Sequence, residues 1–291
     1  MESAESLYAA ARAERHALDD AAVAVRCFGS GPALLFVPGF PVHGYTWRKL
    51  LPTLAERFRC IVVDLPGLGD SEWTPATDFS FGGNARRLQR LAERLGLERF
   101  GLVAHDTGAT VARVLALKAP ERVARLAIIN TEIPGHRPPW IPLYQRLTRV
   151  PGSAAGFRIL LRSRRFLHSS MGFREFYSDR RLLDEPGRLG PYVEPLIASA
   201  HRMEGALRYL RGPEWDVVDA LRERHADLKM PVLLLWGEND RTFPVDLGER
   251  MAQQFGGPTR FVRIARASLM PHEERPDAVL ADLLPFLLGS S

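Results

Sequence analysis

The segment GLVAHDTGATVARVLALKAPERV, residues 101–123, constrains the fold more than any other part of the chain. An apolar run passes directly into a helical pattern, with Asp106 at the junction. Small residues, Ala104 and Gly108, stand two positions to either side of Asp106. A sharp strand–turn–helix requires them, because larger side chains would collide where the two backbones approach. The segment therefore predicts a tight turn that holds the Asp106 carboxyl group at the end of a strand.

The rest of the chain repeats this alternation of strand and helix. Near-continuous Val, Ile and Leu runs bounded by Gly and Pro are typical of strands buried on both faces of a parallel sheet. They occur at 22–28, 33–39, 60–67, 100–105, 124–130, 231–237 and 259–265, with helical patterns at 45–57, 84–96, 107–119, 246–255 and 273–288. The N-terminal stretch 1–20 is also a charged, alanine-rich helical pattern. The alternation predicts an α/β fold with a mostly parallel central sheet flanked by helices.

The alternation breaks between Ile133 and about Asp227, where the sequence is helical, rich in arginine and poor in strand patterns. A group of prolines at 134, 138, 139 and 142 marks its start. Open α/β sheets bind ligands at the carboxyl ends of their strands, so an insertion there would cover the ligand. We therefore expect a core of 1–133 and 226–291, with a helical cap of 134–225.

Composition excludes several classes of protein. The 291 residues are 46% hydrophobic and 25% charged, as in ordinary globular proteins. No apolar run approaches the roughly 20 residues that span a bilayer, and the N-terminus has no apolar signal-peptide core, so we expect a cytoplasmic protein without a membrane partner. Cys27 and Cys60 are too few for a disulfide scaffold and lack metal-ligand spacing, so we expect reduced thiols and no metal.

The net charge of +5 is concentrated in one segment. Nine arginines lie between Arg146 and Arg181, against Glu175 and Asp179 alone. A solvated helical surface is the favoured interpretation, and attraction for an anionic ligand, an acidic partner or nucleic acid is the alternative. No nucleic-acid-binding motif accompanies the charge, so we expect no nucleic-acid partner.

An aspartate at the predicted turn indicates a particular chemistry. A carboxylate that attacks an ester or amide carbonyl forms an anhydride, which is a poor route to hydrolysis. A carboxylate that attacks an sp³ carbon, as in an epoxide or alkyl halide, forms a stable alkyl ester, which water then cleaves with the help of a general base. The alternative is that Asp106 only caps the following helix.

Two segments carry a resemblance to a known family. FVPGFPVHGYTWRKLLPTLAERFRCIVVDLPGLGDSE, residues 36–72, and HDTGATVARVLALKAPERVARLAIIN, residues 105–130, resemble the α/β-hydrolase fold family, in its aspartate-nucleophile branch of epoxide hydrolases and haloalkane dehalogenases. The resemblance covers nearly the whole chain from about residue 22. It implies a small, largely apolar substrate and no cofactor, with Asp106 as nucleophile and the backbone N–H groups of Phe40 and Thr107 as the oxyanion hole.

The same resemblance favours an epoxide as the electrophile. Haloalkane dehalogenases usually hold the halide with a Trp after the nucleophile and an Asn in the oxyanion loop, where this chain has Thr107 and Phe40. Haloalkane dehalogenation is therefore the alternative. Epoxide hydrolases use cap tyrosines to protonate the epoxide oxygen, for which Tyr144 and Tyr209 are the candidates, although Leu210 could occupy the second position instead of Tyr209. Trp140 and Leu269 are expected to line the substrate site.

The acid and the base of the family's usual triad are less simply placed. Asp240, in LLLWGENDRTFP, stands where the family carries its acid, and Glu132 stands at the alternative position after the preceding strand. The family's catalytic histidine precedes the proline of the last helix by seven positions, which from Pro276 gives Leu269. Three hypotheses follow: the hydrolytic step is lost, His272 acts as the base, or the protein only binds a ligand or partner.

Overall fold

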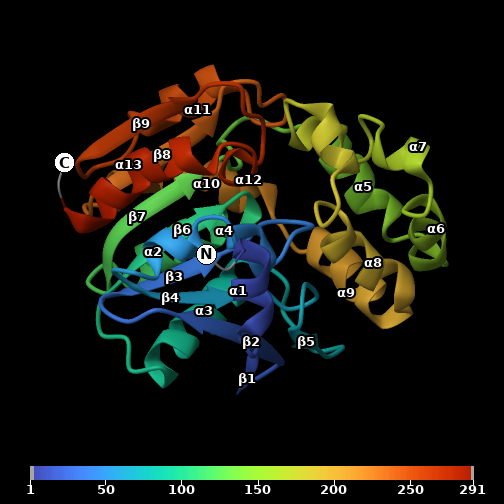
Figure 1. The fold of residues 1–291 in the computed structure, drawn as a ribbon, viewed down its shortest axis with the longest axis horizontal. Coiled ribbons are helices and arrows are strands. Elements are labelled where there is room, and N and C mark those ends of the chain that lie inside the picture. The colour runs from blue at the N-terminus through green and yellow to red at the C-terminus, as the bar shows by residue number, and fades with distance from the viewer. Residues whose placement is uncertain (1–2, 290–291) are drawn as a thin grey trace.

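The computed structural model describes residues 3–289, so the outermost two positions at each end of the predicted core lie outside it. Nine strands form one sheet in the order β1-β2-β4-β3-β6-β7-β8-β9, with β5 paired to β2. Six of them, from β4 across to β9, run parallel, and β1, β2 and β5 pair antiparallel at one side (Figure 1). Their bounds are β1 Glu14–Leu18, β2 Ala21–Phe28, β3 Ala33–Val37, β4 Arg59–Val63, β5 Glu72–Trp73, β6 Phe100–His105, β7 Val123–Ile129, β8 Val232–Gly237 and β9 Thr259–Ile264.

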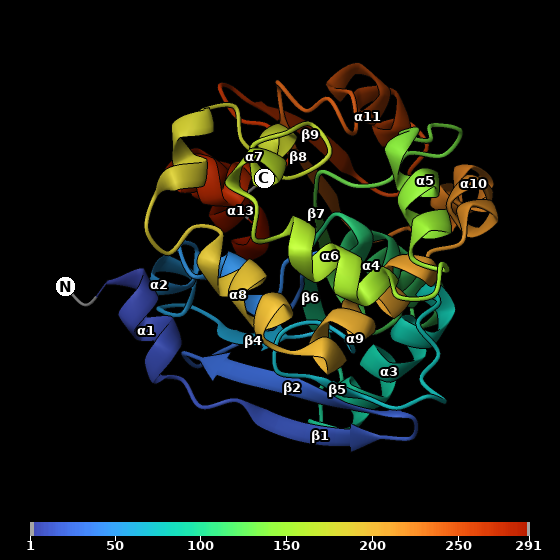
Figure 2. The same ribbon diagram turned by 90° about the vertical axis from the view of Figure 1, so that its right-hand side faces the viewer.

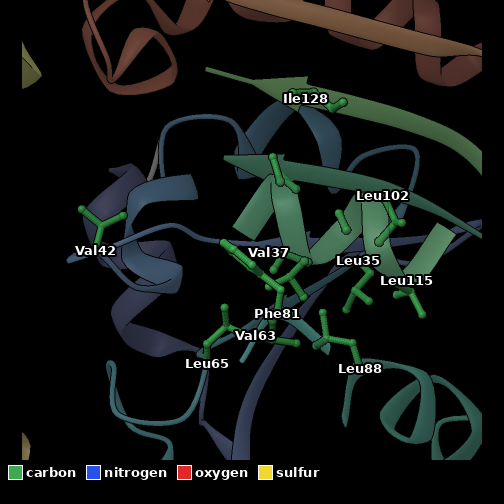
Figure 3. Close-up of a cluster of buried hydrophobic side chains, with 14 of the residues drawn as sticks. Leu35, Val37, Val42, Val63, Leu65, Phe81, Leu88, Leu102, Leu115 and Ile128 are labelled. Atoms are coloured by element: carbon green, nitrogen blue, oxygen red, sulfur yellow. The ribbon is translucent and has the colours of Figure 1, made fainter. Parts of the chain in front are cut away.

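All seven strands predicted from apolar runs are present, and the α/β-hydrolase fold class is confirmed. Every residue of β6 and β8 is buried, as expected for central strands covered on both faces. Alternate residues face opposite layers: Leu35 and Leu102 pack with α3 and α4 on one face, while Phe36 and Val103 pack with α2 and α13 on the other. Figure 3 shows part of the first layer.

Helices flank the sheet, and further helices make up the chain segment that connects the neighbouring strands β7 and β8. In the core they are α1 Ala4–Ala10, η1 Gly44–Trp47, α2 Leu51–Leu54, α3 Phe81–Arg94, α4 Thr107–Lys118, α11 Val245–Ala252, α12 Pro271–Glu274 and α13 Pro276–Leu288. Between β7 and β8 they are α5 Trp140–Leu147, α6 Ser153–Leu160, α7 Arg164–Leu167, η2 Arg174–Phe176, η3 Arg180–Asp184, α8 Gly190–Ala198, α9 Ala200–Arg211, α10 Trp215–Arg224 and η4 His225–Asp227. None of the described helices is long and apolar enough to cross a membrane.

The predicted N-terminal helix is only partly correct. Residues 4–10 form α1, but residues 14–18 form the edge strand β1, which pairs with β2 from Glu14↔Val25 to Leu18↔Ala21. Asp19, with φ of 49°, makes the tight turn between the two strands. Pairing with β2 supplies backbone hydrogen bonds that outweigh the helical preference of a short alanine-rich segment.

The regular structure of the insertion between β7 and β8 is all helical, with loops between the helices and no strand. Helices α5 to α9 gather at one end of the molecule (Figure 1), and Figure 2 looks directly onto them. This arrangement agrees with a cap over the strand ends, although its limits at 134 and 225 stay a prediction.

Candidate active site

Asp106 lies on the tight turn between β6 and α4. Its backbone has φ of 52° and ψ of −131°, a conformation that non-glycine residues seldom adopt and that costs about 1–3 kcal/mol. The small neighbours explain how the turn fits: a Cβ on Gly108 would lie 2.2 Å from the Pro38 carbonyl oxygen, and one on Gly39 would lie 2.4 Å from the Asp106 Cβ. The backbone N–H of Asp106 donates to the Asn130 carbonyl at 2.7 Å, which ties the turn to the end of the neighbouring strand.

The carboxylate of Asp106 is buried and receives backbone hydrogen bonds. The Phe40 N–H donates to Oδ2 at 2.8 Å, and the Thr107 N–H also acts on the carboxylate. Burial raises the pKa of Asp106 well above its usual value, and the negative charge of Glu132 raises it further, while the two N–H groups oppose both effects. These two donors are the groups that the family resemblance assigns to the oxyanion hole.

An apolar cavity lies over Asp106, between the strand ends and the helices of the insertion. Its walls are mainly aromatic and aliphatic side chains of the cap, among them Trp140, Phe157, Phe166, Phe173, Phe176 and Leu207. Asp106, Thr107 and Glu132 line it from the strand ends. A site of this kind accepts a largely apolar molecule whose reactive group reaches the polar end.

Two tyrosines line this cavity in different ways. The Tyr209 hydroxyl lies 3.0 Å from the Thr107 hydroxyl, and the Tyr209 ring stacks on Phe40 at 5.9 Å with 6° between the planes. Of the two candidate positions 209 and 210, it is therefore position 209, with its phenol side chain, that lies beside the turn carrying Asp106. The Tyr144 hydroxyl instead donates to the Met171 carbonyl, and burial raises the pKa of Tyr144 to about 12.

Glu132 follows β7 and lines the same cavity as Asp106. Its Oε2 accepts hydrogen bonds from the hydroxyl groups of Thr110 at 2.6 Å and Thr131 at 3.1 Å. Behind them lies Arg113, a fully buried arginine whose guanidinium donates to both threonine hydroxyls and to the Glu132 carbonyl. Arg113 therefore acts on Glu132 through the threonines and leaves one carboxylate oxygen without a protein donor among residues 3–289.

Asp240 follows β8 and is held outside this cavity. Its Oδ1 accepts the N–H groups of Thr242 at 2.7 Å and Phe243 at 3.0 Å, and its Oδ2 accepts the Asn130 side-chain N–H at 2.5 Å. Burial raises its pKa to about 7 against the lowering effect of these bonds. Asp240 lines a separate polar pocket with Arg174 and other polar side chains, so the structure places only Glu132 of the two predicted acids in the cavity of Asp106.

Leu269 occupies the cavity wall, as the register from Pro276 predicts, and presents no group that exchanges a proton. His272 does not line the cavity. Its Nε2 lies 2.7 Å from the Thr46 hydroxyl, which donates to Glu273, so His272 must donate to Thr46. Burial lowers the pKa of His272 well below its usual value. A neutral histidine with this bond is a structural group, so we do not assign the base to His272.

The sequence did not reveal the importance of another buried carboxylate, that of Glu273 in α12. Together with the residues around it, it forms what we call the Glu273 cluster. The carboxylate contacts the hydroxyls of Thr46 at 2.9 Å, Tyr192 at 2.5 Å and Tyr177 at 3.0 Å, and the guanidinium groups of Arg48 at 3.2 Å and Arg188 at 3.3 Å. These partners come from the core and from the insertion, so the cluster joins the two. No local pattern could show it, because its members lie up to 227 residues apart.

The profile of the alpha/beta hydrolase fold matches residues 32–276. The chain belongs to this family. Over 265 residues it is 24% identical to the uncharacterized hydrolase YugF of Bacillus subtilis, covering 87% of this chain and 89% of that protein. Over 107 residues it is 41% identical to a soluble epoxide hydrolase of Corynebacterium sp., covering 37% of each. The structure of the epoxide hydrolase CorEH without ligand matches with a TM-score of 0.79 at 23% identity, covering 96% of this chain and 99% of that one. At the level of the family, this protein is a hydrolase.

Proposed function

We propose that this α/β hydrolase opens a largely apolar epoxide with Asp106 as the nucleophile and keeps the resulting ester for a long time. One observation carries the proposal: a buried carboxylate sits on a strained turn at the polar end of an apolar cavity, with the Phe40 N–H on one of its oxygens. A carboxylate that merely capped α4 would accept from the second or third N–H of that helix, that of Gly108 or Ala109, whereas no such side-chain cap bond is formed.

In the first step, an Asp106 carboxylate oxygen attacks an epoxide carbon and forms a C–O bond. The C–O bond of the epoxide ring breaks, and its electron pair goes to the epoxide oxygen. The Tyr209 hydroxyl protonates this oxygen, and solvent returns the proton to Tyr209. The hydroxyl of Thr107, 3.0 Å from the Tyr209 oxygen, holds the phenol in place for this transfer.

In the second step, water must attack the carboxyl carbon of the Asp106 ester, and a base must take its proton. Leu269, at the position where the resemblance places the family's histidine, lies on the cavity wall. His272 donates to Thr46 and does not line the cavity. Asp240 lies in a separate pocket, where it accepts the backbone N–H groups of Thr242 and Phe243. Glu132 is the carboxylate that remains in the cavity, but its Oε2 already accepts two hydroxyl groups. Hydrolysis of the ester is therefore the slow step.

An epoxide suits the cavity better than a haloalkane. A departing halide needs N–H donors, and the side chains of Thr107 and Phe40 provide none. An epoxide oxygen needs a proton, which the Tyr209 hydroxyl provides. Haloalkane dehalogenation therefore stays the alternative, and a protein that only binds a ligand is the other.

Intact-mass spectrometry tests the proposal. The protein is incubated with a panel of aryl and alkyl epoxides and with chloroalkanes of the same size, and the adduct is mapped by proteolysis. We expect a stoichiometric adduct on Asp106 with some epoxides, and none in the Asp106→Asn variant. An adduct from chloroalkanes alone would favour the dehalogenase alternative. If no panel member adds mass, Asp106 does not act on these electrophiles.

A further inference from the structure

The outer surface of the cap carries most of the exposed large apolar side chains found among residues 3–289. Of the seven most exposed large hydrophobic residues among residues 3–289, six lie between 143 and 171, and the seventh is Leu288. The six are Leu143, Leu147, Val150, Ile159, Leu160 and Met171, with exposed fractions from 38% to 66%. Exposed apolar side chains that gather in one segment indicate an interaction surface more often than exposed apolar side chains scattered singly do.

The same segment is strongly basic. From residue 140 to residue 172 the sequence contains six arginines (146, 149, 158, 162, 164 and 165) and no aspartate or glutamate. Arg146, Arg149, Arg162 and Arg165 are exposed and form no ion pair with any residue of the described range 3–289. Arg164, by contrast, pairs with Asp184 of η3 at 2.9 Å. The four unpaired arginines leave this segment with an excess of positive charge, which is complementary to an anionic partner.

The apolar and basic residues lie on neighbouring segments of the insertion, from α5 to α7 and the loop that follows α7. Tyr144 of α5 and Phe157 of α6 pack with ring centroids 5.9 Å apart, and the Tyr144 hydroxyl donates to the Met171 carbonyl. These contacts hold α5, α6 and the loop at 171 together at the end of the molecule that faces the viewer in Figure 2. We call this surface, formed by the six apolar residues and the six arginines, the basic apolar face.

We propose that the basic apolar face docks on an anionic lipid bilayer. Interleaved arginine and aliphatic side chains suit a bilayer surface, because the arginines pair with phosphate groups while the aliphatic side chains enter the headgroup region. Nucleic acid or an acidic protein would match the arginines but would leave Ile159 and Leu160 in water. The surface also adjoins the cavity, since Met171 is exposed and lines it. A docked protein would thus take an apolar substrate from the bilayer.

This inference is an alternative to the expectation that the protein has no membrane partner, which rested on the lack of a spanning segment. A protein that lies on a bilayer needs no such segment. The inference is also independent of the chemistry at Asp106, because binding to vesicles is measured without a substrate.

Vesicle sedimentation tests the inference. The full chain is mixed with vesicles of phosphatidylcholine alone or of phosphatidylcholine with phosphatidylglycerol. We expect binding to the anionic vesicles, weakened by high salt, and little binding to phosphatidylcholine alone. A competing DNA duplex or polyglutamate at equal charge concentration should not displace the protein. Failure to sediment with anionic vesicles, equal binding to neutral ones, or displacement by either polymer would overturn the proposal.

Matched variants locate the contact. Replacing two face arginines, Arg162→Gln with Arg165→Gln, should weaken binding by roughly tenfold or more, since each arginine near an anionic surface contributes about a fivefold factor. The control, Arg57→Gln with Arg99→Gln, removes the same charge from exposed positions in the core and should change binding little.

Ile159→Ser tests the apolar part of the face and should weaken binding by roughly tenfold. Its control is Leu288→Ser, at the exposed apolar position outside the face. Thermal unfolding checks that each variant is folded. Equal losses in a face variant and its control would contradict the assignment of the face.

Discussion

Asp106 and Glu273 are both buried carboxylates, yet their surroundings have opposite effects. Asp106 receives backbone N–H groups and lies near a second carboxylate, Glu132, so its pKa is raised, chiefly by burial. Burial would also raise the pKa of Glu273, but the charges of Arg48 and Arg188 and the hydrogen bond from Tyr192 outweigh it and lower the pKa to about 2. At Asp106 the negative charge is stabilised by few groups, whereas at Glu273 arginines and hydroxyl groups offset the cost of burying the charge.

The difference separates reactivity from stability. A nucleophile must keep a free electron pair, so the Asp106 site cannot surround its carboxylate with arginines. The Glu273 cluster has no such limit, and its charge pairs connect α12 to the core at Arg48 and to the insertion at Arg188. The molecule therefore joins its insertion to its core at one buried charge, and we propose that it carries out chemistry at another.

The largest expected effect is on stability, from Glu273→Gln. This change leaves two buried arginines without their carboxylate, which destabilises a protein by about 3–5 kcal/mol. Urea denaturation measures the free energy of unfolding. The matched change at the other site, Asp106→Asn, removes a poorly compensated charge, so it should leave stability unchanged or raise it above neutral pH. Equal losses in the two variants would abolish the contrast between the sites.

The next largest effects come from two tyrosines, one proposed to act in the chemistry at Asp106 and one that stabilises the Glu273 cluster. Tyr209→Phe removes the proposed proton donor, so the rate of ester formation on Asp106 should fall by about 100-fold. Tyr192→Phe removes a hydrogen bond from Glu273 and should lower stability by about 1–3 kcal/mol while leaving that rate nearly unchanged. For both variants, mass spectrometry of samples quenched at successive times measures the rate of ester formation, and urea denaturation measures the free energy of unfolding. A normal rate in Tyr209→Phe would exclude it as the donor.

Asp240 should give a smaller effect that depends on pH. Its pKa is raised from 3.8 to about 7, so the folded state binds the proton more tightly than the unfolded chain, and the stability this provides is lost as pH rises through about 7. Between pH 6 and pH 8 the wild type should therefore lose about 1.4 kcal/mol relative to Asp240→Asn. Asp277→Asn, at an exposed position, is the control. A parallel pH dependence in wild type and Asp240→Asn would contradict the raised pKa.

The contribution of Glu273 to stability depends on pH in the opposite direction from that of Asp240. Its pKa is lowered from 4.5 to about 2, so the stability it provides is present above about 4.5 and is lost as pH falls toward 2.

The smallest effect should come from Glu132→Gln. The charge of Glu132 raises the pKa of Asp106, so its removal should ionise more Asp106 at neutral pH and speed ester formation several-fold. The pH profile of the wild-type rate should rise with pH and should move to lower pH in the variant. A slower reaction in Glu132→Gln would instead assign Glu132 a direct part in the chemistry.

The core and the nucleophile turn could be predicted because their signals are local. Apolar runs placed β3, β6 and β8, and the small residues around Asp106 placed the turn. The spacing from Pro276 placed Leu269 on the cavity wall. The edge strand β1 was missed, because pairing with β2 rather than composition determines its conformation.

The role of His272 and the Glu273 cluster could not be predicted, because each depends on contacts between distant segments. His272 meets Thr46, and Glu273 meets Arg48 and Arg188. The sequence also did not show which residue of α9 points toward the nucleophile turn. The packing of α9 shows that Tyr209 reaches Thr107. The cytoplasmic location stays a prediction.

The lifetime of the Asp106 ester tests the central claim most directly. The protein is loaded with an epoxide that forms the adduct, excess reagent is removed, and the intact mass is followed over hours. We predict that the wild type keeps the adduct, whereas Leu269→His, which returns an imidazole to the cavity wall, loses it and releases the diol. Rapid loss of the adduct from the wild type, with diol formed over many turnovers, would contradict the account.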